Sequence, residues 1–348
     1  MKKIIYFFMI TATVFLFSGC KKESLYDLSD VFYVRYKNAE MPAYVYGNGA
    51  SKVFVIVLHG GPGGKGLEYR PGALSELESD YAIVYFDQRN SGMSSGSYSS
   101  KELTVERMAE DILALVKVIK YKYGNDISLF LLGHSWGGTL GTKVLLMDQT
   151  PFKGWIESDG GHNLAQLVDS QLPLFKSVAN GQINLGNNVR FWERTLDIVN
   201  EVDPVNYTEE DGDRLNSLAF KSESVLLRDG VLETPEGIEL HMMTTLFQTD
   251  PVTATINGAS IGRIMVKEND IWNTIDFTDR LNEITIPALI LWGKYDLVIP
   301  PVLGEEAYEN IGSAEKQFIL YEKSGHSPLM NEYKAFAGDV RDFIERYK

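Results

Sequence analysis

The stretch that most constrains this sequence is Gly-His-Ser-Trp-Gly at residues 133–137, between an apolar run at 127–132 and a helix-like segment that begins near Gly138. A strand that turns into a helix within so few residues holds the turn residue in a strained backbone conformation and exposes its side chain above the sheet. Small residues around the turn let neighbouring chain segments approach closely. The pattern therefore predicts that the Ser135 hydroxyl stands at the positive end of a helix, as a candidate nucleophile.

The order of the other segments indicates a parallel sheet. Apolar runs typical of strands buried on both faces alternate with segments of helical periodicity, and this spacing implies right-handed crossovers. We predict an α/β fold with a mostly parallel sheet flanked by helices. The expected strands are 31–36 and 43–46, as an antiparallel entry, then 53–58, 81–86, 127–132, 152–157, 286–292 and 316–321; the expected helices are 67–80, broken early by Pro71-Gly72, 103–123, 302–310 and 332–347.

Residues 160–283 show a different pattern, mostly helix-like and without a convincing buried strand. Most of the excess negative charge lies here, because residues 160–285 contain 20 acidic and 9 basic side chains. Strand signals resume at residue 286. We therefore predict that residues 159–285 form a helical cap inserted into a sheet domain made of 31–158 and 286–348; a separate acidic domain is the weaker alternative. The net charge of −14 argues against a nucleic-acid partner.

The amino terminus has the layout of an export signal. Lys2 and Lys3 precede an apolar run at 4–17, which is too short for a comfortable membrane span. The run ends in Phe-Ser-Gly-Cys and resembles a bacterial lipoprotein signal, although Leu is commoner at the Phe position. The resemblance implies that residues 1–19 are removed and that Cys20, the only cysteine, anchors the protein to a membrane of the cell envelope, with residues 20–30 as a tether. An ordinary secretory signal is the alternative.

A serine nucleophile needs a histidine base and an acid that orients the histidine. In an open parallel sheet these groups follow the ends of later strands, in the order Ser, acid, His. His326 follows the predicted strand 316–321 in the required order, so we predict that it is the base. The other histidines fit worse, because they lie in glycine-rich turns or in the cap: His59, His134, His162 and His241.

The acid and the oxyanion donors follow from the same strand order. Asp296, after the strand at 286–292, is the preferred acid, and Asp159, after the strand at 152–157, is the alternative. The backbone N–H of Trp136, next to the serine, is one expected oxyanion donor. The second should come from the loop after the strand at 53–58, and so from Gly60 or Gly61.

Together these motifs resemble the α/β-hydrolase superfamily and, within it, the proline iminopeptidase group. The resemblance rests on His-Gly-Gly-Pro-Gly at 59–63, Asp-Gln-Arg at 87–89 with Gly92 and Ser94, the run at 133–138, Asp296 and His326. It covers the predicted sheet domain. It implies a serine aminopeptidase that removes an amino-terminal residue, often proline, from small peptides, and that needs no metal or organic cofactor.

The sequence departs from the group at Asn90 and at Leu297, and the second departure keeps other functions open. Asn90 stands where Gly is usual, which is mild because Asn tolerates positive φ. Leu297 stands where some members place a Glu that binds the substrate's ammonium. Four cap acids could replace it: Glu193, Glu201, Glu223 and Glu239. The alternative is a hydrolase of carboxylic esters or lactones, and a third possibility is a binding module without activity, against which the complete Ser, Asp and His set argues.

Overall fold

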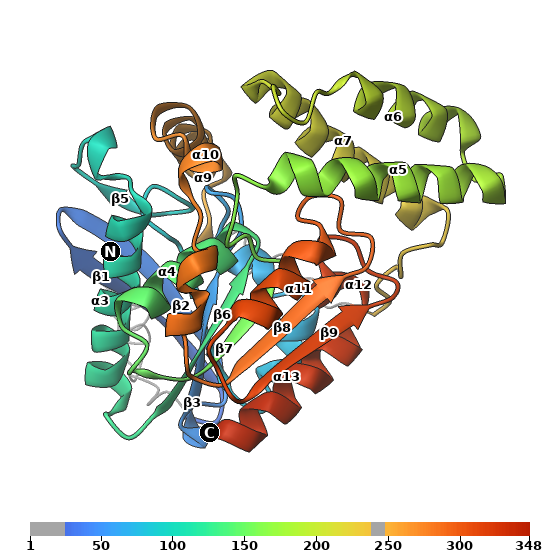
Figure 1. Ribbon diagram of the computed structural model, residues 1–348. Helices are drawn as coiled ribbons and strands as arrows, with labels where there is room; N and C mark the ends of the chain where they lie inside the picture. The colour runs from blue at the N-terminus through green and yellow to red at the C-terminus, as the bar shows by residue number, and fades with distance from the viewer. Residues whose placement is uncertain (1–24, 238–247) are drawn as a thin grey trace, which may run out of the picture.

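A computed structural model describes residues 25–237 and 248–348 (Figure 1). Its centre is one sheet with the strand order β1-β2-β4-β3-β6-β7-β8-β9, and β5 pairs at the side with β2. The first two strands are antiparallel to their neighbours, and β3, β4, β6, β7, β8 and β9 pair in parallel. The strand bounds are Leu28–Tyr36, Ala39–Gly47, Val53–Leu58, Ala82–Phe86, Ser95–Gly96, Ser128–His134, Phe152–Ser158, Ala288–Gly293 and Lys316–Tyr321.

Strands β3 and β4 are apolar throughout because both faces of the sheet are covered. In β3, Phe54, Ile56 and Leu58 join one hydrophobic core, whereas Val55 and Val57 join the core of the opposite face. Helices α3 (Val105–Tyr123), α4 (Trp136–Met147) and α11 (Pro301–Asn310) supply side chains to the first core. Helices α2 (Ala73–Leu77), α12 (Pro328–Asn331) and α13 (Tyr333–Tyr347) supply the second.

The segment between β7 and β8 is helical. It contains α5 (Leu167–Leu185), α6 (Val189–Glu201), α7 (Glu209–Arg228), α9 (Pro251–Arg263), a π-helical turn (Ile264–Glu268) and α10 (Ile271–Thr274). Figure 1 shows these helices along one edge of the sheet, where α5, α6 and α7 form a layer of their own. In the described part of this segment no named strand forms; a single bridge joins Asn163 to Asp276.

Local signals fix the ends of several helices. The Thr104 side chain accepts a hydrogen bond from the Arg107 N–H at the start of α3, and Gly124 ends that helix, as its sequence predicts. Thr208 and Asp211 form a capping box at the start of α7. Asp250 caps α9, whose first residue is Pro251.

Most predicted elements are confirmed to within a few residues, and one is wrong in length. The predicted helix at 67–80 is instead a 3₁₀ turn at Gly66–Tyr69 and the five-residue helix α2. Pro71-Gly72 separates them, and Gly72 has φ +78, which a continuing right-handed helix cannot accommodate. The predicted roles of Cys20, Glu239 and His241 concern positions outside the described residues.

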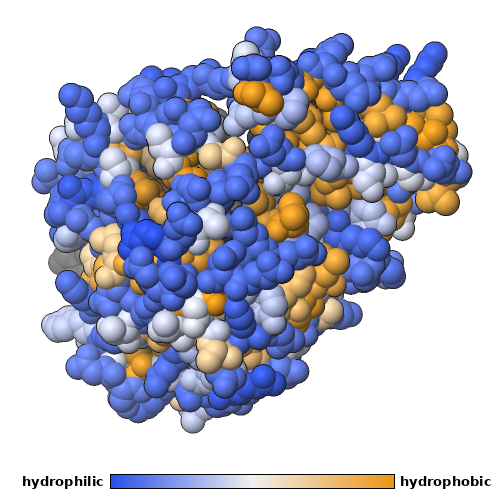
Figure 2. All heavy atoms as spheres, in the orientation of Figure 1, coloured by the Kyte–Doolittle hydropathy of each residue, from blue (hydrophilic) through white to orange (hydrophobic). Residues whose placement is uncertain are grey.

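The surface is mainly polar on the face seen in Figure 2, and hydrophobic residues gather there on the helical layer that carries α5 and α6. Leu185, at the end of α5, is 71% exposed. Among the described residues, no helix combines the length and apolar character needed to cross a membrane.

Candidate active site

The serine predicted as the nucleophile lies at a sharp turn between β6 and α4. Ser135 has φ +56 and ψ −126, a strained conformation for a residue with a side chain, and its side chain is half-buried. The turn is possible because its neighbours lack side chains. A Cβ on Gly133 would lie 2.3 Å from the Gly137 oxygen, and one on Gly137 would lie 2.0 Å from the Leu58 oxygen. The predicted strained turn is therefore present, with the serine at the amino-terminal end of a helix.

The predicted base and acid are in direct contact with each other. His326 Nδ1 and Asp296 Oδ2 are 2.8 Å apart, and both side chains are buried. The other Asp296 oxygen accepts hydrogen bonds from the N–H groups of Val298 and Ile299, so the carboxylate is held in one orientation. Burial lowers the pKa of His326, which leaves the ring neutral and able to accept a proton at neutral pH.

The alternative acid, Asp159, is part of the same cluster. It is fully buried, and its oxygens accept from the Gly293 N–H at 2.8 Å and from the Ser158 hydroxyl at 2.7 Å. Its carboxyl also hydrogen-bonds Asp296. Burial, and then the charge of Asp296, raise the pKa of Asp159 well above its usual range. Two buried carboxyls in contact cannot both be ionised, and Asp296, which faces His326 and two backbone donors, is the better stabilised anion.

Asp159, Asp296 and His326 also have the side-chain types of a metal-ligand set, since their ligand atoms lie within 4.8 Å of one another. Each of the carboxylate oxygens, and the His326 Nδ1 atom, already has a hydrogen-bond partner within the protein. This cluster therefore suits a Ser-His-Asp arrangement, in which Asp296 orients the ring and no ion is required.

The two glycines predicted as oxyanion donors differ in the hydrogen bonding of their N–H groups. The Gly60 N–H donates to the Tyr69 hydroxyl at 2.8 Å. The Gly61 N–H has no hydrogen-bond partner within residues 25–237 and 248–348. A Cβ on Gly61, which has φ +128, would lie 2.4 Å from the Gly63 nitrogen, so this loop needs glycine there. Of the two glycines, Gly61 therefore has the N–H that is free to serve, with that of Trp136, as a candidate oxyanion donor.

Tyr69 was not singled out by the sequence, because its partners are remote in the chain. Its hydroxyl also lies 2.7 Å from His134 Nδ1, and His134 Nε2 lies 2.6 Å from the His326 carbonyl oxygen. Burial lowers the pKa of His134 to about 3, so the ring is neutral. The histidine before the serine therefore links the loop after β3 to the loop that carries His326, which is a structural contact.

The Asp-Gln-Arg turn after β4 is also structural. Gln88 donates to the His59 carbonyl oxygen at 2.8 Å and accepts from the Trp136 indole at 3.0 Å. Arg89 forms a fully buried ion pair with Asp111 of α3. The turn thus connects the two glycine-rich loops through Gln88.

Of the four acids proposed from the sequence as amine ligands, only Glu223, within the described residues, contacts the loops that carry Asp296 and His326. Its two oxygens accept from the backbone N–H groups of Leu297 and His326, at 3.3 and 3.1 Å. Burial, and then the charge of Asp296, raise the pKa of Glu223 to about 8. By contrast, Glu201 pairs with Arg214 on the surface, and Glu193 is exposed on α6.

The candidate nucleophile, base and oxyanion donors line one cavity of about 520 Å³ between the sheet edge and the helical segment. Ser135, Trp136, Gly60, Gly61 and His326 line it from the core. The lining residues from the helical segment are Leu164, Leu167, Asp213, Asn216, Phe220, Gly262, Val266 and Trp272. The cavity is therefore large enough for a small acyl or peptidyl substrate.

Two family models match this chain. The model for the α/β hydrolase fold matches residues 53–191, and the model for serine aminopeptidases of family S33 matches residues 268–334. A proline iminopeptidase of Saccharolobus solfataricus is 26% identical over 300 residues, which is 84% of each chain. A probable aminopeptidase of Bacillus subtilis, YbaC, is 22% identical over 308 residues, covering 87% of this chain and 92% of the relative.

The solved structure of an esterase from Exiguobacterium antarcticum superimposes with a TM-score of 0.57 at 20% identity, covering 90% of this chain and 98% of the esterase. The sheet, its flanking helices and these matches define the α/β-hydrolase fold, as the sequence predicts. The matches also support the interpretation that the protein is a hydrolase of the α/β-hydrolase superfamily.

Proposed function

We propose that the protein is a serine aminopeptidase that releases an amino-terminal residue, proline or a similar one, through an acyl-enzyme. The observation that supports this most is that Ser135, at the strained turn, and His326, which is paired with Asp296, line the same cavity. The similarity to proline iminopeptidases over most of the chain favours a peptide substrate.

The proposed reaction follows the usual order for a serine hydrolase. The Ser135 hydroxyl attacks the carbonyl carbon while His326 Nε2 accepts its proton. The developing oxyanion is stabilised by the N–H groups of Gly61 and Trp136, and loss of one such donor typically costs about a hundred- to a thousandfold in rate. His326 then gives the proton to the leaving amine. In the second half of the reaction His326 takes a proton from water, the water attacks the acyl-enzyme, and His326 returns the proton to Ser135. Throughout, Asp296 keeps the His326 ring in one orientation.

We further propose that Glu223 binds the substrate's ammonium group. Its carboxylate lies against the loops of Asp296 and His326, one helical turn beyond Phe220, which lines the cavity. A bound ammonium would favour the charged form of Glu223 and offset the effect of burial. Leu297, which stands in place of the amine-binding Glu of some relatives, is fully buried.

The Glu223→Gln variant tests this role. We expect KM for a prolyl arylamide to rise about tenfold or more, because a charge-assisted hydrogen bond is lost, of the size of about 1.5–3 kcal/mol. Turnover of a nitrophenyl ester without an amine should change little. An equal loss of activity on both substrates would instead indicate that Glu223 holds the loops of Asp296 and His326 in place.

The second candidate is a hydrolase of carboxylic esters or lactones. The buried Leu297, without a carboxylate, favours it, and so does the similarity in fold to an esterase. The two functions are separated by initial rates of the purified full chain on a prolyl arylamide and on a short-chain nitrophenyl ester. Arylamide turnover that is lost in Ser135→Ala supports the aminopeptidase, and ester turnover alone supports the alternative.

We also propose that Cys20 carries the lipid that anchors the protein to a membrane of a bacterial cell envelope. The support is the sequence alone: the basic start, the apolar run and the single cysteine after Ser-Gly. The Cys20→Ser protein should move from the membrane fraction to the soluble fraction when cells are broken. Retention of that variant in the membrane fraction would contradict the proposal.

A further inference from the structure

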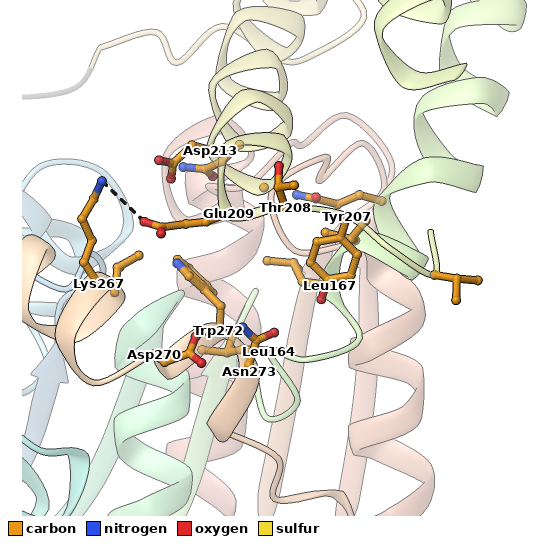
Figure 3. A pocket seen from close by; sticks show the side chains of 16 residues that line it. Leu164, Leu167, Tyr207, Thr208, Glu209, Asp213, Lys267, Asp270, Trp272 and Asn273 are labelled. Carbon is orange, nitrogen blue, oxygen red and sulfur yellow. Dashed lines mark hydrogen bonds and ion pairs between the residues drawn. The ribbon is translucent and has the colours of Figure 1, made fainter. Parts of the chain in front are cut away.

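A second cavity adjoins the one around Ser135. It measures about 620 Å³ and lies between the start of α7 and the turn that joins the π-helical segment to α10 (Figure 3). The two cavities have six wall residues in common: Leu164, Leu167, Asp213, Asn216, Val266 and Trp272. We call this second cavity the outer chamber. Because the two cavities share these wall residues, a ligand at Ser135 that is longer than one residue can extend into the outer chamber.

Helix α7 runs along both chambers. Glu209 and Asp213 line the outer chamber, Asp213 and Asn216 line both, and Phe220 lines the cavity of Ser135. These positions are three or four residues apart, so they share one face of the helix. At about 1.5 Å per residue, the stretch from Asn216 to Glu209 is about 10 Å long, which is roughly three residues of extended peptide.

The contacts of α7 also give the cleft a direction. Glu223, at the far end of this face, touches the loops of Asp296 and His326, and we have proposed it as the ammonium ligand. An aminopeptidase holds one residue on the amine side of the scissile bond and the rest of the peptide on the other side. The longer arm, which leads away from Glu223 past Asn216 to Glu209, is therefore the arm for the departing peptide.

The chemistry of the outer chamber favours some peptides over others. In Figure 3 the Trp272 side chain lies opposite the α7 residues Glu209 and Asp213. Three carboxylates line the chamber, and its one lysine, Lys267, is paired with Glu209 at 3.4 Å. Asp213 is exposed, and its carboxylate has no ion pair or side-chain hydrogen bond to a described residue. The excess negative charge repels a carboxylate and attracts a basic group.

We infer that the outer chamber is the subsite for about three residues after the scissile bond, and that it selects neutral or basic peptides over acidic ones. This inference rests on the proposed aminopeptidase function. It is carried by the shared wall of the two cavities, the direction of α7 and the excess of carboxylates. Trp272 and Leu167 offer the peptide apolar contact, while Asp213 faces its charged groups.

The test uses the full chain in mild detergent and three prolyl substrates. One is an arylamide, which is too short to fill the outer chamber and reports the proposed function alone. The others are the C-terminally amidated tetrapeptides Pro-Ala-Arg-Ala and Pro-Ala-Glu-Ala, compared by kcat/KM. The wild-type protein should prefer the Arg peptide, and Asp213→Asn should reduce that preference about two- to fivefold, as expected for one exposed ion pair.

Glu201→Gln is the matched control, because Glu201 is an acid of the same helical segment that pairs with Arg214 outside both cavities. It should leave the Arg-to-Glu preference unchanged. Equal rates on the two tetrapeptides, or the same effect of both variants, would overturn the inference while leaving the aminopeptidase in place. Absence of Ser135-dependent arylamide turnover would overturn the proposed function, and the inference with it.

Discussion

The loops at the sheet edge and the helical segment above them are built differently. Asp159, Asp296 and His326 are almost completely buried, and each is held by backbone or buried partners. In contrast, the acids of α7 that line the outer chamber are exposed, and among the described residues Glu209 has one ion-pair partner, Lys267 at 3.4 Å. A reacting group must be held in one geometry, whereas groups that choose among substrates need only present charge and shape. This contrast fits the proposal that the core carries out the chemistry and that the helical segment determines the selectivity.

Replacement of Ser135 by Ala should have the largest effect of any change. We expect kcat on the preferred substrate to fall by about a thousandfold or more, with only the binding and oxyanion contributions remaining. Ser224→Ala, an exposed serine on α7, is the control and should retain activity. Turnover by Ser135→Ala at the wild-type rate would contradict the proposal that Ser135 is the nucleophile.

Replacement of each of the two buried acids by Asn should lower kcat to very different extents. Asp296→Asn is expected to lower kcat by about a thousand- to ten-thousandfold, because the amide cannot stabilise the charged ring of His326. Asp159→Asn should retain activity to within about tenfold, since a neutral amide can still accept from Gly293 and hydrogen-bond Asp296. Steady-state kinetics of both variants decides this, and a loss in Asp159→Asn as large as in Asp296→Asn would make Asp159 the orienting acid.

The stability of the core should depend on pH through Asp159. Its pKa is raised well above the ordinary value of 3.8, so above about pH 4 the unfolded chain loses this proton while the folded protein keeps it. The folded state binds more protons, and its stability falls as pH rises until the raised pKa is reached, by up to about 1.4 kcal/mol per pH unit. Asp159→Asn should remove this part of the decline when urea unfolding is compared at pH 5 and pH 8. An unchanged pH dependence would contradict it.

The smallest effects are expected when one glycine in each region is replaced by alanine. Gly137→Ala places a Cβ 2.0 Å from the Leu58 oxygen, and it should destabilise the protein by about 1–3 kcal/mol and disturb the serine turn. Gly181→Ala, in α5, meets nothing within 4 Å and should stabilise the protein by about 0.5–1 kcal/mol, because alanine favours a helix. Thermal unfolding measures both, and destabilisation by Gly181→Ala would show that the helical segment is packed as tightly as the core.

The same contrast explains how far the sequence alone could lead. The strained turn at Ser135 is specified by its immediate neighbours, so it could be predicted from residues 127–138. The choice between Asp296 and Asp159 could not be made with certainty from order alone, because β7 and β8 pair in parallel with Ser158 opposite Leu291. Their ends meet at one edge, and only the contacts of each carboxyl distinguish their environments.

Glu223 and Tyr69 had weaker signals because their partners are remote. Glu223 lies 74 residues from Leu297 and 103 from His326. The sequence signal for Glu223 is the spacing of acids and Phe220 at intervals of three or four residues, which places them on one face of α7. Nothing in the local sequence around Tyr69 indicates that its hydroxyl meets both Gly60 and His134.

The central claim, that Ser135 is an activated nucleophile, is tested most directly by covalent labelling. The full chain would be treated with a fluorophosphonate, which reacts with activated serines, and its proteolytic peptides weighed by mass spectrometry. The account predicts one adduct, on the peptide that contains Ser135, and its loss in His326→Ala. No adduct on Ser135 in the folded wild-type protein, or equal labelling of His326→Ala, would contradict the claim.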